Sequence, residues 1–457
     1  MEEYHVVVIG SGTAGQTAAY DLNEKGLQVA VVERSDHPGG TCSQYGCQPK
    51  KWFYEATETI FRCRHLEGKG IAGIPRGVWP EVLREKSRFT SAVPQRTVEG
   101  FQKAGIAFFR GEARFKDSET LQAGDTTLKA SFFLVATGAR PMPLPFEGAE
   151  HMITSSDFLE LENLPPRMIF VGGGFISFEF AHFAARLGPP QMQIHILEAA
   201  ERPLGPFDEE MVQLLVEASR DEGIEVLSNV KITSLERKSS GIVVSTASGE
   251  NFEGDLVVHG AGRVPDLDGL NLEAAGVNHS RRGIEVDASM RTSNERIFAL
   301  GDCAATIQLA RVADEEGHTA AANILAELRG GRPAAMDYGA VPSMLFTCPQ
   351  YGMVGKTEEN LREEGMPYRK SFGKNLSWPT YQRVGMKHAA YKILAAEDGK
   401  VLGAHILSDN GCGLVTTFRL AMHQKMTVDE LYRACIMTPY PSRESDIIYM
   451  LKPLLRD

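Results

Sequence analysis

The sequence lacks an excess of positive charge, and this limits its partners. Its 457 residues include 48 lysines and arginines against 59 aspartates and glutamates, for a formal net charge of −11. A protein with no basic excess has no field with which to neutralise phosphates, so nucleic acid is not an expected partner.

Long apolar runs are also missing. The opening segment, MEEYHVVVIG, is acidic, and its apolar stretch is too short for a signal peptide or a membrane span. No other stretch of the sequence has membrane-spanning length. We therefore expect a cytoplasmic protein without a membrane partner.

Cysteine is scarce. Seven cysteines in a chain of this length do not make a structural disulfide framework, and an odd number in a reducing compartment points to a catalytic or transient disulfide. With 43% hydrophobic and 23% charged residues, the composition is that of a globular protein of about three domains.

The first informative segment is VVVIGSGTAGQTAAYDLNEKGLQVAVVERSD, residues 6–36. A β-branched run, a glycine turn, a helical stretch and a second apolar run predict a dinucleotide-binding fold. Gly10, Gly12 and Gly15 fit its fingerprint, in which phosphate binds at the helix N-terminus. Glu33 ends the second strand, where a carboxylate accepts hydrogen bonds from a ribose.

A second copy begins at MIFVGGGFISFEF, residues 168–180. Gly172 and Gly174 hold the first two fingerprint positions, and Ser177 is small enough for the third. Glu198 ends the next strand, and its charge favours NADH because it repels the 2′-phosphate of NADPH. Arg202 lies nearby in the sequence and keeps NADPH as the alternative. Two such folds predict two nucleotides and hydride transfer from a nicotinamide to a flavin.

The region after about Asp337 has a different pattern. Two apolar runs flank Asp398 and Gly399, which predicts a β-hairpin, and helical patterns follow it. This region contains no glycine fingerprint, so we expect an α+β module.

Two cysteines, Cys42 and Cys47, stand in GGTCSQYGCQPKK, residues 39–51. Without two further cysteine or histidine partners they do not make a zinc site, and no metal is expected. Pro49 and the helical pattern after it predict that both cysteines lie at the start of a helix, whose positive end would lower the pKa of the thiols.

The order of these motifs resembles the pyridine nucleotide-disulfide oxidoreductases, which include glutathione reductase, dihydrolipoamide dehydrogenase and mercuric reductase. The similar elements are the first fingerprint, GGTCSQYGCQPKK, ATGARP (136–141), the second fingerprint, GAGRVPD (260–266) and ALGDCA (299–304). The resemblance implies an α/β homodimer with two Rossmann-like domains, for FAD and NAD, and a C-terminal α+β dimerisation domain. The expected boundaries are 1–145 and 266–335 for FAD, 146–265 for NAD(P) and 336–457 for dimerisation.

The resemblance also assigns roles to single residues. Cys47 is implied to face the flavin as the charge-transfer thiol, and Cys42 to exchange with the substrate. Glu179 with Lys50 or Lys51 matches an ion pair near the flavin, and Phe175 matches an aromatic gate over the nicotinamide. The residues assigned to nucleotide binding by fingerprint or resemblance are Gly10, Gly12, Gly15, Glu33, Thr41, Thr137, Gly138, Gly172, Gly174, Phe175, Glu198, Gly262 and Asp302.

The C-terminal segment departs from the family. Dithiol enzymes of the family carry a histidine and a glutamate there as acid and base, whereas CIMTPYPSRESDII, residues 435–448, has no histidine. One register places Thr438 and Arg443 at the two positions, and the other places Tyr440 and Ser445 there. A tyrosine, with an ordinary pKa of about 10, transfers protons poorly near neutral pH.

Three functions follow from this pattern. The first is an FAD- and NADH-dependent oxidoreductase whose Cys42 and Cys47 exchange electrons with a sulfur substrate, such as a dithiol, a lipoyl-like group or polysulfide. The second is a mercuric-reductase-like metal-ion reductase using Tyr440 and Cys42. The third is a flavoprotein without turnover that serves as a partner in a complex. The sequence does not identify the substrate, the direction of transfer or the residue that replaces the histidine.

Overall fold

The first nucleotide-binding segment forms a strand, a glycine turn and a helix, as the sequence predicts. In the computed structural model, which describes residues 1–456, strand β1 (Glu2–Ile9) leads into α1 (Thr13–Glu24), and β2 (Val29–Glu33) follows in parallel to β1. Strand β6 (Thr126–Val135) pairs with the other edge of β1, also in parallel.

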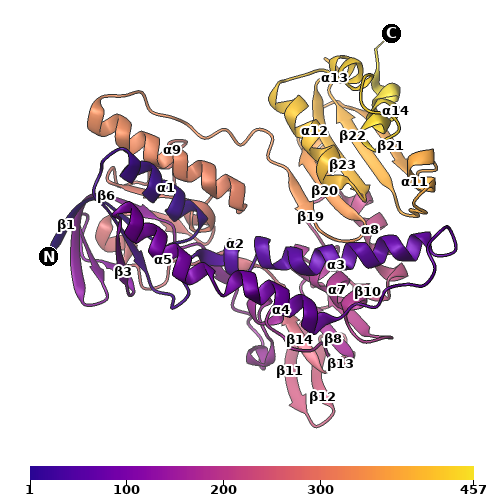
Figure 1. Ribbon diagram of the computed structural model, residues 1–457, viewed down its shortest axis with the longest axis horizontal. Helices are drawn as coiled ribbons and strands as arrows, with labels where there is room; N and C mark the ends of the chain where they lie inside the picture. Colours follow the sequence, from indigo (N-terminus) through magenta and orange to yellow (C-terminus); the bar gives the residue numbers. More distant parts are fainter. Residues whose placement is uncertain (457) are drawn as a thin grey trace. The chain divides into compact units, whose positions relative to one another are not determined.

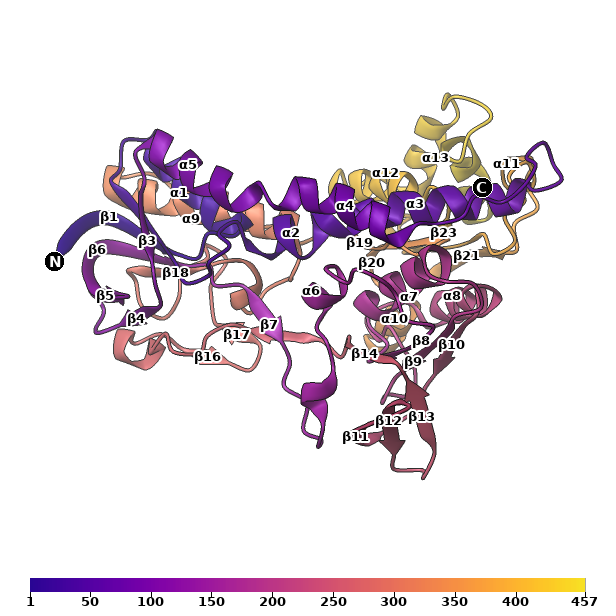
Figure 2. The ribbon, with the colours of Figure 1, turned by 60° about the horizontal axis from the view of Figure 1, so that its bottom comes forward.

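These strands belong to a seven-stranded sheet with the order β3-β2-β1-β6-β5-β4, in which β18 also pairs with β6. Alternate residues of β1 lie on opposite faces: Val6 and Val8 pack in one apolar cluster, while Val7 and Ile9 pack in another. A parallel sheet with apolar residues on both faces must be covered on both. One cover is formed by α1 and α9 (Ala310–Arg329), which lie side by side in both views (Figures 1 and 2).

The chain divides into two compact units. Unit 1 contains residues 1–52, 84–143 and 262–337, and unit 2 contains residues 53–83, 144–261 and 338 to the C-terminus. The breaks after residues 143, 261 and 337 lie within a few residues of expected boundaries, whereas those after 52 and 83 were not expected, and the expected NAD(P) and dimerisation domains fall in one unit. Residues 53–83 group with unit 2, although the sequence placed them in the first domain. The FAD, NAD and dimerisation labels of the sequence-based domains stay predictions.

The remaining elements of unit 1 complete its sheet and its connections. They are α2 (Gly40–Gln44), α5 (Val93–Ala104), β3 (Ala107–Arg110), β4 (Ala113–Phe115), β5 (Thr120–Ala123), β7 (Ala139–Pro141), β15 (Arg263–Pro265), β16 (His279–Ser280), β17 (Gly283–Ile284) and β18 (Ile297–Ala299). Two helices, α3 (Cys47–Leu66) and α4 (Trp79–Thr90), contain residues of both units.

Unit 2 holds the second nucleotide-binding segment in a four-stranded parallel sheet, ordered β10-β9-β8-β14. A three-stranded antiparallel sheet, β11-β12-β13, accompanies it (Figure 2). The elements are α6 (Ser155–Phe158), β8 (Arg167–Val171), α7 (Phe175–Leu187), β9 (Gln193–Leu197), α8 (Glu209–Asp221), β10 (Ile224–Leu227), β11 (Ile232–Lys238), β12 (Gly241–Thr246), β13 (Asn251–Gly254) and β14 (Leu256–His259).

The α+β module expected after Asp337 is confirmed. A five-stranded antiparallel sheet has the order β19-β20-β23-β22-β21, and α12 covers β20 and β23. The predicted hairpin is the pair β22 and β23. The elements are β19 (Ser343–Leu345), β20 (Gln350–Gly355), α10 (Glu358–Glu363), β21 (Arg369–Lys374), α11 (Pro379–Gln382), β22 (Ala390–Ala395), β23 (Val401–Ser408), α12 (Gly411–His423), α13 (Val428–Cys435) and α14 (Ile447–Leu451).

Over residues 1–456, no helix combines the length and the apolar character that crossing a bilayer requires.

Candidate active site

The first glycine loop joins β1 to α1 with backbone contacts that exclude larger residues. Gly10 has a φ of +107°, and a Cβ there would lie 2.3 Å from the carbonyl oxygen of Ala136. A Cβ on Gly15 would lie 2.1 Å from the carbonyl oxygen of Gly10. Gly12 is the N-cap of α1 and makes no side-chain capping hydrogen bond. The loop therefore forms a cradle open to an anion at a helix N-terminus, which fits the pyrophosphate of FAD.

Glu33 lies at the end of β2 with its carboxylate directed back to this loop. Its Oε2 accepts hydrogen bonds from the backbone N–H of Ser11 at 2.9 Å and from the Ser11 hydroxyl at 2.6 Å. Its Oε1 accepts from the N–H of Ser35 at 2.8 Å. The carboxylate is thus fixed next to the turn, which is the place for binding a ribose diol.

The second glycine loop repeats this arrangement between β8 and α7. Gly172 has a φ of +95°, and a Cβ there would lie 2.4 Å from the Cα of Ala261. Gly174 is the N-cap of α7 and, like Gly12, has no side-chain capping hydrogen bond. Ser177 is fully buried, and a Cβ on Gly260 would lie 2.0 Å from its hydroxyl oxygen. A second nucleotide cradle is therefore present in unit 2.

Glu198 follows β9 directly and copies the contacts of Glu33. Its Oε2 accepts from the N–H of Gly173 at 2.5 Å, and its Oε1 accepts from the N–H of Ala200 at 2.7 Å. Arg202, in contrast, donates to the carbonyl oxygens of Phe207 and Gly205, both at 2.8 Å. The guanidinium is thereby held against its own loop.

Cys42 and Cys47 come together through two successive helices. Cys42 lies in α2, and Cys47 is the first residue of α3, so the expectation of one helix start for both is corrected. The two side chains are hydrogen-bonded to each other. This hydrogen bond, burial and the charge of Cys47 raise the pKa of the Cys42 thiol, whereas the sequence predicts a lowered value. Such a pair titrates as a unit, with one proton shared between two sulfurs.

Asp302 lies in a short 3-10 helix, Gly301–Cys303, directly after β18. Burial raises the pKa of its carboxyl, and the charge of Arg263 partly offsets the effect. Thr137 and Gly138 follow β6, and Gly138 and Gly262 both have positive φ. The pairing of β7 with β15 ties these two turns together, with Met142 donating to the carbonyl oxygen of Gly262. These turns thus belong to unit 1, together with the first glycine loop. The cofactor roles assigned to these residues and to Thr41, an exposed residue of α2, stay predictions.

The residues of the predicted ion pair near the flavin belong to different units. Lys50 and Lys51 are half-buried in the first turns of α3. Glu179 is fully buried in α7, where its Oε1 accepts from the N–H of Phe346 at 2.9 Å. Phe175 is the first residue of α7, and 48% of its surface is exposed. The ion pair and the gate stay predictions.

The C-terminal segment presents Tyr440, which is 75% exposed. The alternative residues at the acid and base positions are engaged in structural contacts. Arg443 is buried and forms an ion pair with Asp409, with Nε 2.7 Å from Oδ1. The Ser445 hydroxyl donates to the carbonyl oxygen of Ser442 at 2.7 Å. Of the four residues that the two registers place at the acid and base positions, Tyr440 is exposed and Thr438 is half-buried.

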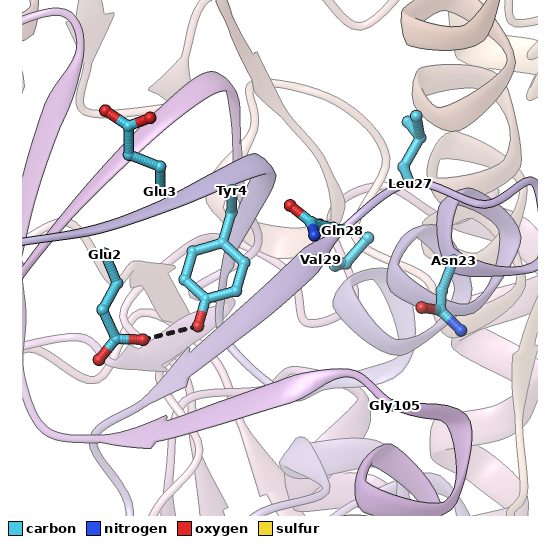
Figure 3. Close-up of a pocket in the computed structure, with 8 residues that line it drawn as sticks. All are labelled: Glu2, Glu3, Tyr4, Asn23, Leu27, Gln28, Val29 and Gly105. Carbon is cyan, nitrogen blue, oxygen red and sulfur yellow. Dashed lines mark hydrogen bonds between the residues drawn. The ribbon is translucent and has the colours of Figure 1, made fainter.

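The cavity shown in Figure 3 is not part of this arrangement. It has a volume of about 460 Å³ and lies at the amino ends of β1 and β2, opposite the ends that carry the glycine loop. The Tyr4 hydroxyl donates to Glu2 at 2.8 Å, and burial together with this contact raises the pKa of Tyr4 to about 12. None of its eight lining residues is a predicted site residue. Parallel sheets bind nucleotides at the other edge.

Sequence reasoning missed two residues of the site, Ser11 and Thr13. Ser11 connects Glu33 to the segment before Cys42, because its hydroxyl also accepts from the N–H of Gly39 at 3.0 Å. Thr13 lies near Cys42 and acts to lower the pKa of its thiol. Both occupy variable positions of the GSGTAG fingerprint, so the motif itself gave no signal.

The glycine cradles, the fixed acids and the cysteine pair define an oxidoreductase of the two-nucleotide, redox-thiol class. Residues 4–317 match the family described as pyridine nucleotide-disulphide oxidoreductase, and residues 341–446 match its dimerisation domain. The chain belongs to this family and is an FAD-dependent oxidoreductase that uses a nicotinamide nucleotide.

The relatives that this chain resembles have different enzymatic activities. The chain is 30% identical to dihydrolipoyl dehydrogenase of Geobacillus stearothermophilus over 442 residues, covering 94% of this chain and 92% of that protein. It is also 30% identical to mercuric reductase of Staphylococcus aureus over 441 residues, covering 94% and 79%. Among solved structures, the Cu(II) complex of the HOCl-induced flavoprotein disulfide reductase RclA from Escherichia coli superposes with a TM-score of 0.88. The identity there is 23% over the full length of both chains, which shows a shared fold.

Proposed function

We propose that the protein passes electrons from NADH through bound FAD to a Cys42–Cys47 disulfide, and from the resulting dithiol to a sulfur substrate. The observation that carries this proposal is the contact between the two cysteine side chains beside the first glycine loop. The close packing of Gly40 on Gly12 holds the cysteines beside this loop, and two inert core cysteines would not require it. The family's dimerisation domain supports a homodimer as the working form.

The nucleotides supply an electron pair, and the remaining chemistry belongs to the chain. The bond between the two sulfurs breaks as two electrons and a proton enter, leaving one thiol and one thiolate. The hydrogen bond and charge of Cys47 raise the pKa of Cys42, so the proton resides on Cys42 and the negative charge on Cys47.

Transfer to a disulfide substrate then takes two exchanges. Once Cys42 loses its proton, its sulfur attacks one substrate sulfur; a mixed disulfide forms and the first substrate thiolate departs. Cys47 attacks Cys42 in the mixed disulfide, which restores the protein disulfide and releases the second thiolate. The balance is one disulfide reduced to two thiols for each NADH oxidised to NAD⁺, with one proton from solvent.

NADH is the nucleotide that the second loop favours. The Glu198 carboxylate is fixed by two backbone N–H groups and would repel a 2′-phosphate. Arg202, the cation nearest in sequence, is bonded to two carbonyl oxygens of its own loop. Neither residue is therefore placed to bind the 2′-phosphate of NADPH.

A metal-ion reductase is the second candidate. It is favoured by the exposed Tyr440 in a segment without histidine, and by the full-length similarity to a mercuric reductase. Thiolates bind soft metal ions without the proton transfer that a disulfide requires.

An anaerobic titration with NADH tests these proposals. The purified flavoprotein is reduced stepwise while its spectrum is recorded, and is then challenged with a disulfide, with polysulfide and with Hg(II). A long-wavelength thiolate–flavin band at two electrons, discharged by a sulfur compound, supports the sulfur substrate, and discharge by Hg(II) alone supports the metal substrate. Bleaching of the flavin without this band would refute the redox role of the cysteines and favour a non-turnover partner protein.

A further inference from the structure

Two glycines form the turn directly before Thr41 and Cys42. Gly39 and Gly40 have φ angles of +124° and +76°, which cost little only for glycine. A Cβ on Gly40 would lie 2.5 Å from the Cα of Gly12, so the turn packs directly on the first nucleotide loop. Because glycines restrict the backbone little, the position of this turn depends on the hydrogen bonds that reach it from other segments.

Ser11, in the first nucleotide loop, makes such a hydrogen bond. Its side chain is fully buried, and its hydroxyl oxygen accepts from the backbone N–H of Gly39 at 3.0 Å. The same hydroxyl donates its one hydrogen to Oε2 of Glu33 at 2.6 Å, because an ionised carboxylate can only accept. The hydrogen bonds therefore run in one direction, from the N–H of Gly39 through the hydroxyl of Ser11 to the charge of Glu33. A charged acceptor polarises the hydroxyl and makes its oxygen a stronger acceptor for the N–H.

The two oxygens of Glu33 face different parts of the site. Oε2 accepts from both the N–H and the hydroxyl of Ser11, which occupies its two lone pairs. Oε1 accepts from the N–H of Ser35, and its second lone pair can accept from a ribose hydroxyl. One carboxylate oxygen thus serves the nucleotide loop, and the other is connected to the turn before Cys42.

We propose that Ser11 is a positioning residue of the redox pair, whose hydroxyl ties the turn before Cys42 to the acid of the first nucleotide loop. This inference rests on the proposed function, because the position of Cys42 matters only if it forms a disulfide with Cys47. Ser11 itself transfers neither a proton nor an electron. It holds the turn in the place from which Cys42 pairs with Cys47, so loss of the hydroxyl makes that pairing less favourable.

The test measures how readily the two cysteines form their disulfide. The holoenzyme is equilibrated anaerobically with mixtures of reduced and oxidised glutathione, quenched with acid and alkylated, and mass spectrometry reads the oxidised fraction of the pair. The exchange converts two protein thiols and one glutathione disulfide into one protein disulfide and two glutathione thiols, so its midpoint gives the effective concentration of the pair. The variant is Ser11→Ala, which removes the hydroxyl. Ser43→Ala is the matched control, because the Ser43 hydroxyl donates to the same turn, at the carbonyl oxygen of Gly39 2.7 Å away, from α2 instead of the nucleotide loop.

In Ser11→Ala the effective concentration should fall about three- to tenfold, which is part of the effect of one buried hydrogen bond, because the bond is present both before and after the disulfide forms. Reduction of the flavin by NADH should remain close to the wild type, and Ser43→Ala should resemble the wild type in both measurements. An unchanged equilibrium in Ser11→Ala would overturn the proposal, as would an equal shift in Ser43→Ala or an equal loss of reduction by NADH, which would indicate general damage to the fold. If Ser11→Ala does not retain FAD, Ser11→Gly is judged by the same criteria, since the fingerprint accepts any small residue between Gly10 and Gly12.

The glutathione equilibrium does not depend on turnover, so the two proposals fail separately. A normal thiolate–flavin band in the wild type with an unchanged equilibrium in Ser11→Ala rejects the role of Ser11 alone. The absence of that band in the wild type rejects the proposed function, whatever the equilibrium shows.

Discussion

We propose that the selectivity of the second nucleotide loop rests on one charge, that of Glu198, and the substitution Glu198→Gln tests this proposal. The carboxylate is half-buried and oriented by the N–H groups of Gly173 and Ala200, at 2.5 and 2.7 Å. Glutamine keeps the volume of the side chain and one acceptor oxygen but removes the charge. Its effect is therefore electrostatic more than steric.

The expected magnitude follows from Coulomb's law. Two unit charges about 4 Å apart interact with about 4 kcal/mol at an effective dielectric constant of about 20. Salt and the partial exposure of Glu198 reduce this repulsion, and about 2 to 3 kcal/mol is expected between its carboxylate and a 2′-phosphate. Relief of this repulsion should raise the efficiency with NADPH by about 30-fold to 160-fold. NADH should lose about fivefold, or about 1 kcal/mol, because glutamine replaces a charge-assisted hydrogen bond to the ribose with a weaker neutral one.

The assay is anaerobic rapid mixing of the oxidised flavoprotein with NADH or NADPH, followed by the flavin absorbance. The rate at low nucleotide concentration gives the efficiency for each, and the ratio of the two removes any loss of active protein. Glu33→Gln is the matched control, because Glu33 makes the same contacts in the first loop, with Ser11 and Ser35. It should weaken the retention of FAD and leave the ratio of NADH to NADPH unchanged.

Two results would refute the reasoning. An unchanged ratio in Glu198→Gln would mean that the carboxylate does not face the 2′ position. An equal change of the ratio in Glu33→Gln would mean that the two loops are not specialised for different nucleotides.

Four further predictions concern the redox pair, the C-terminal tyrosine and the fold. Cys47→Ser should abolish the thiolate–flavin band of the reduced protein, and persistence of the band would exclude Cys47 as the charge-transfer thiol. Tyr440→Phe should slow oxidation of the reduced protein by its acceptor and leave reduction by NADH intact; equal slowing of both halves, or of neither, would remove Tyr440 from the mechanism. Lys392 is 1% exposed in its side chain and lies 2.7 Å from Asp208 and 2.9 Å from Glu358, so Lys392→Met should lower the free energy of unfolding by about 3 to 5 kcal/mol in urea titrations. Burial opposes ionisation of Glu358, yet hydrogen bonds from Lys392 and its neighbours lower its pKa from 4.5 to about 2. The ionised Glu358 should contribute fully to the free energy of unfolding above pH 4.5, and this contribution should disappear as the pH falls through 2. The wild type should therefore lose stability in acid, and Glu358→Gln should lose less. Equal acid dependence of the two proteins would contradict this prediction.

The nucleotide-binding folds could be predicted because short stretches of consecutive residues determine their strands, turns and helices. The glycine spacing at Gly10 and Gly172 is forced by backbone atoms of Ala136 and Ala261, and no other residue type fits there. The acids at the strand ends, Glu33 and Glu198, follow from the same local rule. A tight turn between a strand and the next helix is formed by a few consecutive residues, so it leaves a recognisable pattern in the sequence.

Other parts of the site were not predictable, because they depend on which side chains the fold brings together. Thr13 and Cys42 belong to different helices, and the fingerprint allows almost any residue at position 13. The pKa of Cys42 was predicted with the wrong sign, since the helix terminus was weighed without the neighbouring Cys47 sulfur. Arg202 was kept as a possible ligand for a phosphate, and only its hydrogen bonds to two carbonyl oxygens show how it is held. Charge and hydrogen bonding are properties of the folded site, whereas glycine spacing is a property of the chain.

The missing imidazole restricts the class of sulfur substrate. When Cys42 attacks a disulfide, the departing thiolate either takes a proton from a nearby acid or leaves as the anion. No histidine lies between residues 435 and 457, and Arg443 is fixed by Asp409, so Tyr440 is the exposed side chain at the acid and base positions of the two registers. Substrates whose thiols have a low pKa need no such proton and should be reduced fastest. In a series of disulfides of similar size, the rate of oxidation of the reduced protein should therefore fall steeply as the pKa of the leaving thiol rises. A rate that does not depend on the pKa of the leaving thiol would indicate a general acid outside this segment. Ordinary alkyl disulfides and lipoyl groups would then also be expected to be good substrates.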